Sequence, residues 1–147
     1  MSRATEDANR RLLRARDVMD RAYAEPLDIA ALARVAYVSQ AHFIRRFRAT
    51  FGETPHRYLQ RRRVERAMFL LRSTDHTVTD ICLETGFTSL GTFSRTFTDI
   101  VGEAPTAYRA RGPLASVPSC FAMGWARPSS HLPNGAVSEK PERQPAE

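Results

Sequence analysis

The sequence has few cysteines, a single lysine and no long apolar run, and each scarcity excludes a class of protein. Two cysteines in 147 residues, Cys82 and Cys120, are too few for a disulfide framework or for an unaided zinc site. No stretch approaches the length needed to cross a membrane, and the N-terminus has no apolar signal-peptide core. We therefore expect a soluble cytoplasmic protein with no metal, no cofactor and no membrane partner.

Residue sets typical of catalysis are missing as well. The four histidines are scattered along the chain, and there is no Ser/His/Asp set and no glycine-rich phosphate loop. A chain of this length is also expected to leave no sizeable pocket for a small molecule. The sequence therefore predicts a protein that is not an enzyme.

The positive charge is almost entirely arginine and is concentrated in one block. Lys140 is the only lysine among 22 basic residues. Residues 29–72 contain ten arginines against Glu53 and Glu65, a net charge of +8, whereas residues 73–111 carry −2 and both ends are neutral. Such a block suits a polyanion, and arginine makes bidentate contacts to phosphate and guanine. A solvated helical face would have the same composition, so charge alone leaves the partner open.

The most informative feature is an internal repeat with an offset of 50 residues. The pattern S-x3-F-x-R-x-F-x4-G-E-x-P-x2-Y occurs twice, beginning at Ser39 and again at Ser89. Upstream of these serines the offset falls to 49, because residues 32–33 correspond to residues 81–82. We expect two copies of one structural unit, the second with a turn one residue longer.

Each copy is predicted to be a helix, a short turn and a second helix. The four helices are expected at Ile29–Ala36, about Gln40–Phe51, about Val78–Thr85 and about Leu90–Val101. A polar residue suited to an N-cap precedes each of them: Asp28, Ser39, Thr77 and Ser89. Glycines suited to C-caps follow the second helix of each copy: Gly52 and Gly102.

Two further helices are expected outside the copies. One begins at Ser2 or Thr5 and runs to about Ala24, and the other runs from Pro55, after an N-cap at Thr54, to about Arg72. No segment has the alternation typical of a strand. The predicted fold class is all-α, with two tandem helix-turn-helix subdomains of the homeodomain-like kind, at about 29–51 and about 78–101. A long central helix at about 55–72 joins them.

The second helix of each copy divides into an apolar face and a polar face. Phenylalanines four residues apart are expected to anchor the apolar faces in the core: Phe43, Phe47 and Phe51 in the first, and Phe93 and Phe97, with Val101, in the second. The other face of such a helix enters the DNA major groove. The residues that project from it are Ala41, Ile44, Arg45 and Arg48 in the first copy, and Gly91, Ser94, Arg95 and Thr98 in the second.

Arginine is the residue on these faces that best reads a base, because its guanidinium can bond two acceptors of guanine. Arg45 and Arg95 occupy the same site of both copies and are predicted to contact bases, although a surface arginine can also pair with a nearby acid. The residues predicted to contact phosphates are Ser39, Gln40, Arg48, Ser89, Leu90 and Thr98.

The central helix predicts how the two copies are spaced. Residues 55–72 would span about 27 Å at the standard helical rise, and successive major grooves on one face of DNA lie about 34–36 Å apart. A rigid helix of this size could hold the two copies in adjacent grooves. A monomer would then read two half-sites that need not be palindromic.

The C-terminal residues 112–147 differ in composition from the rest. They contain six of the nine prolines, together with serines and balanced charge, which is typical of a flexible tail. The stretch 120–125 is more apolar, and it could instead pack on the domain or contact a partner. We expect residues 1–111 to be the DNA-binding unit and truncation after Arg111 to leave DNA binding largely intact.

The stretch Leu27–Arg109 resembles the DNA-binding domain of the AraC/XylS family of bacterial transcription regulators, in particular its single-domain MarA/SoxS-like members. The matching residues are Arg63-Val64, Ala67, Leu70-Leu71, Ile81-Cys82, Gly86-Phe87, Phe93, Arg95, Phe97, Gly102, Pro105, Tyr108 and Arg109. The resemblance implies transcriptional control through promoter DNA and RNA polymerase, by a monomer that bends its DNA. Carried over by position, the base-contacting residues are Ala41, Ile44, Arg45, Gly91, Ser94 and Arg95.

Some positions depart from this family's pattern. Cys82 stands where alanine is usual and is expected to be a small buried hydrophobe. Arg46 stands where an apolar residue is usual and is expected to extend to water or a phosphate. Thr96 and Thr98 leave the second recognition helix poor in charge, which predicts that the first copy grips DNA more tightly.

One alternative from a different class stays open. The same fold could act as a protein-interaction module that contacts RNA polymerase or another regulator without reading DNA. The duplicated arginines and the +8 block favour DNA over this alternative.

Overall fold

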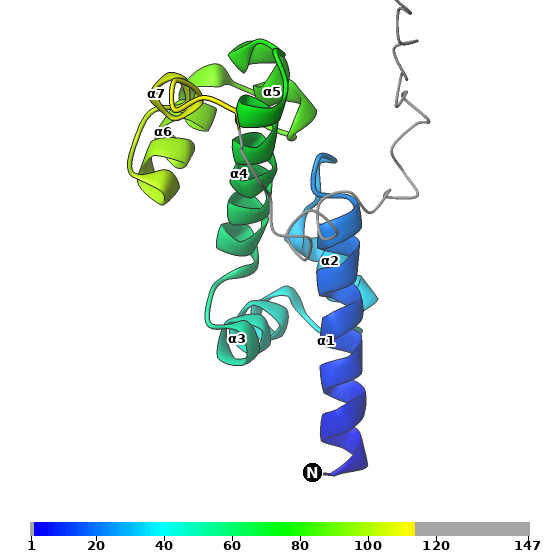
Figure 1. The fold of residues 1–147 in the computed structure, drawn as a ribbon. Helices are drawn as coiled ribbons and strands as arrows, with labels where there is room; N and C mark the ends of the chain where they lie inside the picture. Colours follow the sequence, from blue (N-terminus) through cyan, green and yellow to red (C-terminus); the bar gives the residue numbers. More distant parts are fainter. Residues whose placement is uncertain (1, 114–147) are drawn as a thin grey trace, which may run out of the picture.

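A computed structural model describes residues 2–113, which form an all-helical structure, as the sequence predicts (Figure 1). The helices are α1 (Arg3–Arg21), α2 (Ile29–Val35), α3 (Gln40–Phe51), α4 (Pro55–Ser73), α5 (Val78–Glu84), α6 (Leu90–Val101) and α7 (Pro105–Arg109). None of these described helices is long and apolar enough to span a bilayer. Cys120, the stretch 120–125 and all but the first two residues of the expected tail lie outside the described residues.

The helix α4 is shared by two hydrophobic cores. Its first half packs with α1, α2 and α3 to form subdomain 1, and its second half packs with α5, α6 and α7 to form subdomain 2. Tyr58 and Leu59 belong to the first core, whereas Val64 and the apolar residues after it belong to the second. In Figure 1, α1 and α2 lie on one side of α4, and α6 and α7 lie on the other.

The predicted helix caps are confirmed. Each predicted N-cap side chain accepts a hydrogen bond from the main-chain N–H three residues later: Asp28 at 2.6 Å, Thr77 at 3.0 Å, and Ser39, Thr54 and Ser89 at 3.2 Å. Gly52 and Gly102 end α3 and α6 in the left-handed conformation, with φ of 79° and 91°. A side-chain N-cap stabilises a helix by about 1 kcal/mol. Local sequence therefore specifies both ends of each recognition helix.

The helices α2 and α5 each end one residue before the predicted end, at Val35 and Glu84. Two other helices differ more from the sequence prediction. Ser2 caps α1, and the helix ends at Arg21 rather than near Ala24, because Pro26 disfavours helical geometry at Glu25 and the chain turns before it. The short helix α7 was not predicted; it lacks a side-chain cap, since Ala104 stands where the first copy has Thr54. The offset of 50 between Pro55 and Pro105 could have revealed it.

The two helix-turn-helix turns are built alike. Tyr37 and Gly86, 49 residues apart, both have positive φ, at 58° and 93°. The next residue in each turn donates an equivalent 3.1 Å hydrogen bond, from Val38 to Ala33 and from Phe87 to Cys82. The predicted longer second turn is therefore confirmed, and the extra residue is Thr88, just before Ser89.

The glycines provide a matched test of how closely the two subdomains touch. A Cβ added at Gly86 would lie 2.8 Å from Ala24 Cα, whereas one at Gly102 would meet nothing within 4 Å, and both residues have φ near +90°. Gly102→Ala should cost about 1–2 kcal/mol of unfolding free energy from the left-handed strain alone. Gly86→Ala should cost about 1–3 kcal/mol more, from overpacking.

Urea denaturation of the two variants and the wild type measures this difference. Equal losses for Gly86→Ala and Gly102→Ala would show that Ala24 does not press on the second turn.

Candidate nucleic-acid interface

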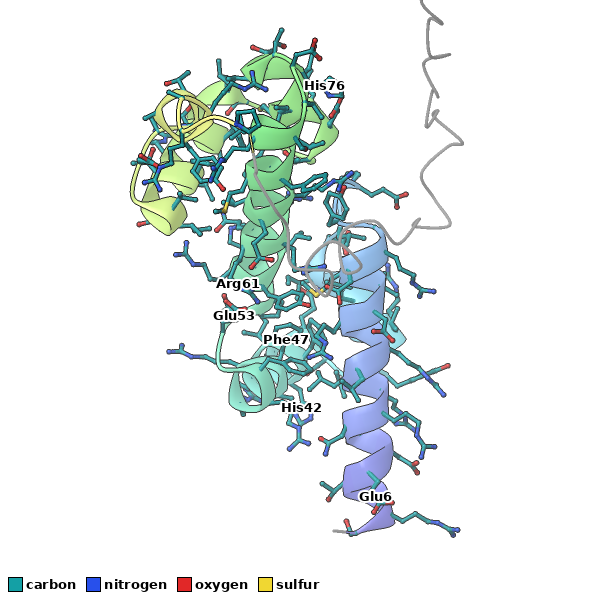
Figure 2. All side chains as sticks on the ribbon, viewed as in Figure 1. Glu6, His42, Phe47, Glu53, Arg61 and His76 are labelled. Atoms are coloured by element: carbon teal, nitrogen blue, oxygen red, sulfur yellow. The ribbon has the colours of Figure 1, made fainter. Side chains whose placement is uncertain are left out.

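The recognition helices α3 and α6 are anchored in the same way. Phe43 and Phe47 in α3, and Phe93 and Phe97 in α6, are fully buried, which confirms the predicted anchoring faces. Phe47 meets Tyr58 edge-on at 5.5 Å, and Phe97 meets Tyr108 edge-on at 5.7 Å. In Figure 2, Phe47 lies inside subdomain 1 whereas His42 of the same helix extends toward solvent. The predicted anchors Phe51 and Val101, at the helix ends, are only half-buried.

The polar faces of the two helices are open to solvent. Of the residues predicted to contact bases, Ser94 is half-buried and the others are exposed: Ala41, Ile44, Arg45, Gly91 and Arg95. All the residues predicted to contact phosphates are exposed: Ser39, Gln40, Arg48, Ser89, Leu90 and Thr98. The apolar residues Ile44 and Leu90 also lie on these faces, 38% and 45% exposed. Their exposure suits a surface that meets a partner.

The face of α6 carries a charge that sequence reasoning missed. Ser94, Arg95 and Thr98 line one shallow hollow together with Asp99. The Asp99 carboxylate forms an ion pair at 2.9 Å with Arg57 at the start of α4, which offsets its repulsion of a phosphate. The Thr98 hydroxyl donates to the Ser94 carbonyl at 2.7 Å, so it must rotate before it can donate to a phosphate.

A repeated ion pair holds the end of each recognition helix. Arg61 contacts Glu53 at 2.7 Å, and Arg111 contacts Glu103 at 2.6 Å. The guanidinium carbons of these arginines lie 5.2 Å and 5.9 Å from the rings of Tyr58 and Tyr108. The glutamates, the tyrosines and the arginines of the two copies are each 50 residues apart. The repeat therefore extends to Arg61 and Arg111, beyond the range predicted from the sequence.

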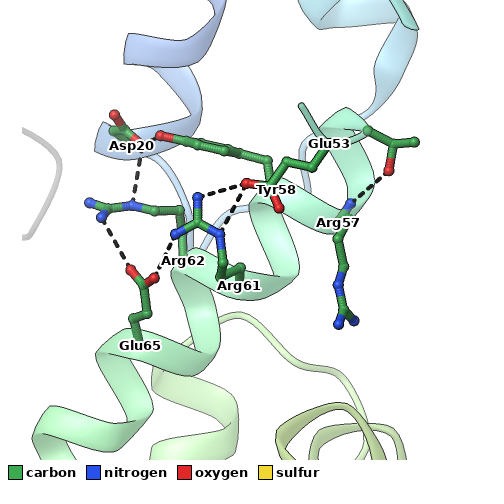
Figure 3. Close-up of polar contacts among 8 residues, drawn as sticks. Asp20, Glu53, Arg57, Tyr58, Arg61, Arg62 and Glu65 are labelled. Atoms are coloured by element: carbon green, nitrogen blue, oxygen red, sulfur yellow. Dashed lines mark hydrogen bonds and ion pairs between the residues drawn. The ribbon is translucent and has the colours of Figure 1, made fainter. Parts of the chain in front are cut away.

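In subdomain 1 this ion pair is part of a larger network (Figure 3). Arg61 also contacts Glu65 at 2.6 Å, and Arg62 contacts Glu65 at 3.4 Å and Asp20 of α1 at 3.2 Å. The Tyr58 hydroxyl donates to Asp20 at 2.6 Å. Burial and this bond to Asp20 raise the pKa of Tyr58 well above its ordinary value, and the bond to Glu53 raises that of Arg61. The network fastens α1 to α4.

These contacts divide the +8 block into structural and surface charges. Arg57, Arg61 and Arg62 are paired with carboxylates, two of which, Asp20 and Asp99, lie outside the block. The arginines of the block that project from α2 and α3 into solvent are Arg34, Arg45 and Arg48. Much of the charge on α4 is therefore structural, and the exposed arginines of the block lie on the helix-turn-helix of subdomain 1.

The structure shows the contacts of Arg46 and Cys82, two residues that depart from the family pattern. Arg46 was expected to extend to water or a phosphate; instead its Nη2 donates to Asn9 of α1 at 3.5 Å, and the side chain is half-buried. Cys82 is buried in the second core, as predicted, and burial raises the pKa of its thiol. Among residues 2–113, no group of three or more His, Cys, Asp or Glu side chains is arranged to hold a metal ion.

Comparison with known protein families agrees with this geometry. A helix-turn-helix domain family matches residues 32–111, which is more than half of the chain. A transcriptional regulator of Chromobacterium violaceum with an AraC-type DNA-binding domain is 30% identical, with a TM-score of 0.65 over 70% of this chain and 92% of that one. The chain belongs to the AraC-type family of helix-turn-helix DNA-binding transcription regulators.

Two other relatives are matched over very different shares of their own length. The DNA-binding domain of AdpA, a global transcriptional factor solved in complex with a target DNA, is 32% identical, with a TM-score of 0.63 over 68% of this chain and 90% of that one. An uncharacterized HTH-type transcriptional regulator of Staphylococcus aureus is 33% identical over 97 residues, 66% of this chain. The match spans only 13% of that regulator's length.

The repeated ion pairs differ in burial, and stability measurements can separate them. Arg61 is 37% exposed and hydrogen-bonds two half-buried carboxylates, whereas Arg111 is 60% exposed and forms an ion pair with one. Arg61→Ala should lower the unfolding free energy by about 1–3 kcal/mol, because charged hydrogen bonds are lost and Glu53 is left unpaired. Arg111→Ala should cost less than about 1 kcal/mol.

Chemical denaturation of both variants tests this ranking. A loss for Arg111→Ala as large as that for Arg61→Ala would contradict it.

Proposed function

We propose that this chain regulates transcription as a monomer that inserts α3 and α6 into successive major grooves on one face of double-stranded DNA. One observation carries the proposal: two helices, anchored by equivalent phenylalanines, present Arg45 and Arg95 at equivalent exposed sites. The connecting helix α4 has 19 residues, and it is about 28 Å long at the standard rise. That length is comparable to the spacing of about 34–36 Å between successive major grooves on one face of DNA.

In this proposal each arginine reads a guanine edge, and the small residues beside it allow close approach. Ala41 and Gly91 stand one turn before these arginines and have little or no side chain to keep a base away. Ile44 offers an apolar contact to a thymine methyl, and Ser94 offers a hydroxyl. The N-termini of α3 and α6 bring main-chain N–H groups to the phosphates.

The two helices should contribute unequally to affinity. The face of α3 exposes both Arg45 and Arg48, whereas α6 exposes Arg95 beside Asp99. Because phosphate neutralisation dominates affinity for DNA, α3 should supply most of the binding free energy. The helix α6 should then act mainly in selecting the sequence.

Several wider statements belong to the same proposal and rest on the family resemblance. We place the DNA-binding unit at residues 1–111 and regard residues 112–147 as an appendage to it. The protein would act in the bacterial cytoplasm on nucleoid DNA, contact RNA polymerase and have no catalytic role.

Base selection by Arg45 and Arg95 can be tested directly. Preferred duplexes are first selected from a random pool with the wild type, and each variant is then titrated against single-base changes. Arg45→Ala and Arg95→Ala should each lose preference at one position, and each should weaken binding about 5- to 150-fold, equivalent to about 1–3 kcal/mol. Arg14→Ala is the matched control, because Arg14 is equally cationic and exposed but lies on α1.

The outcomes separate the rival functions. If Arg45→Ala and Arg95→Ala retained full selectivity, the base contacts would be assigned wrongly. If the wild type shifted no duplex in a gel-shift assay even at low salt, the fold would serve protein interaction without reading DNA.

A further inference from the structure

The two subdomains touch at few places besides α4. Every helix pair in extensive contact among the described residues lies within one subdomain or includes α4 itself. Contacts across the boundary join the segment 22–25 after α1, through Ala24 and Arg63, to the turn at residues 86–87 before α6. An ion pair between Arg57 and Asp99 also crosses it. The relative orientation of α3 and α6 therefore depends on α4 and on this small junction.

Arg63 of α4 lies at the boundary between the two cores. Leu59, four residues before it, packs in the first core, and Val64, directly after it, packs in the second. The Arg63 Nε donates to the Tyr23 carbonyl at 2.6 Å, and Nη2 donates to the Glu25 carbonyl at 2.9 Å. One guanidinium thus binds the segment that follows α1 through two hydrogen bonds.

The same guanidinium faces the second subdomain. The carbon Cζ of Arg63 is 5.9 Å from the centre of the Phe87 ring, which belongs to the second core. Beside it, the main chain of Ala24 approaches Gly86 so closely that no Cβ would fit there. Arg63 therefore connects the loop of subdomain 1, the middle of α4 and the turn of subdomain 2.

The half-buried guanidinium of Arg63 is fixed in place by its two hydrogen bonds. Burial lowers the pKa of the Arg63 guanidinium from its ordinary value, although an arginine remains protonated in proteins. Hydrogen bonds from a charged donor are shorter and stronger than neutral ones, and the planar fork of arginine directs two of them at once. Removing the donor would leave two carbonyls without these partners and would release the loop.

A second polar contact crosses the boundary but has different surroundings. Arg57 and Asp99 form an ion pair at 2.9 Å, with side chains 43% and 68% exposed. Exposed pairs contribute little to stability because water screens them and the long side chains lose entropy. This pair provides the natural control for Arg63.

We propose that Arg63 is a positioning residue that sets the angle between the two recognition helices, and through it the spacing of half-sites that the protein accepts. The proposal rests on the two-groove function above. A bend of about 15° in the middle of α4 would displace the end of the helix by about 3–4 Å, because each half of α4 is about 14 Å long. One base-pair step is about 3.4 Å. The displacement caused by a small bend at Arg63 is therefore comparable to the length of one base-pair step.

The first test measures the angle in the absence of DNA. Spin labels are attached at Ala49→Cys in α3 and Ala107→Cys in α7, in the full chain carrying Cys82→Ala and Cys120→Ser, and the distance distribution is measured by pulsed electron paramagnetic resonance. Arg63→Met should broaden or shift the distribution, Arg63→Lys should restore part of it, and Arg57→Ala should leave it unchanged. Circular dichroism checks that each variant is folded, and Arg63→Lys decides the outcome if Arg63→Met is not. A distribution that neither Arg63 variant alters would overturn the proposal.

The second test measures spacing on DNA. For the wild type, inserting or deleting one base pair between the selected half-sites should weaken binding by about tenfold or more, because simultaneous engagement is lost. The Arg63 variants should bind the best spacing more weakly, with a flatter dependence on spacing, while affinity for one isolated half-site is unchanged. Equal weakening at every spacing and on the single half-site would indicate a purely structural role and would overturn the proposal. A wild type indifferent to spacing would instead count against the two-groove function, and the label distances would still decide the role of Arg63.

Discussion

A buried phenylalanine on each recognition helix packs against a tyrosine of the following helix, and this contact orients both recognition helices. Phe47 on Tyr58 and Phe97 on Tyr108 turn one side of α3 and α6 inward, and the helical period then fixes what points outward. Because Arg45 lies two residues before Phe47, and Arg95 two before Phe97, both arginines must face solvent once the aromatic rings are buried.

The charges of the chain serve two purposes that composition cannot distinguish. On α4 the arginines bind carboxylates and carbonyls of α1, of the segment after it and of the end of α3, and Arg63 also faces the ring of Phe87 in the second turn. On α2 and α3 they remain at the surface, as Arg34, Arg45 and Arg48. The structural arginines make the scaffold rigid, and a rigid scaffold reduces the entropic cost of placing the surface arginines on DNA.

The sequence was sufficient for the parts of the fold that depend on local chemistry. The serine caps Ser39 and Ser89, the glycines Gly52 and Gly102, and the spacing of the phenylalanines predicted the starts and lengths of α3 and α6, because each signal acts within one or two helical turns. The short helix α7 and the pair Arg111–Glu103 could have been found from the repeat offset. The acceptors of Arg63 could not be predicted, because they are main-chain carbonyls 38 and 40 residues away, which every residue has and no side-chain pattern reveals. The partner of Asp99 was hidden for the same reason, since Arg57 lies across the subdomain boundary. The assignment of individual base contacts stays a prediction.

Hydroxyl-radical footprinting of the full chain on its selected duplex, with the stoichiometry measured by analytical ultracentrifugation, shows whether one molecule occupies two grooves. One chain should protect two windows whose centres lie about 10 base pairs apart on one face of the duplex. A single window for one chain, with the second appearing only when a second chain binds, would contradict the claim that one molecule places both recognition helices on DNA.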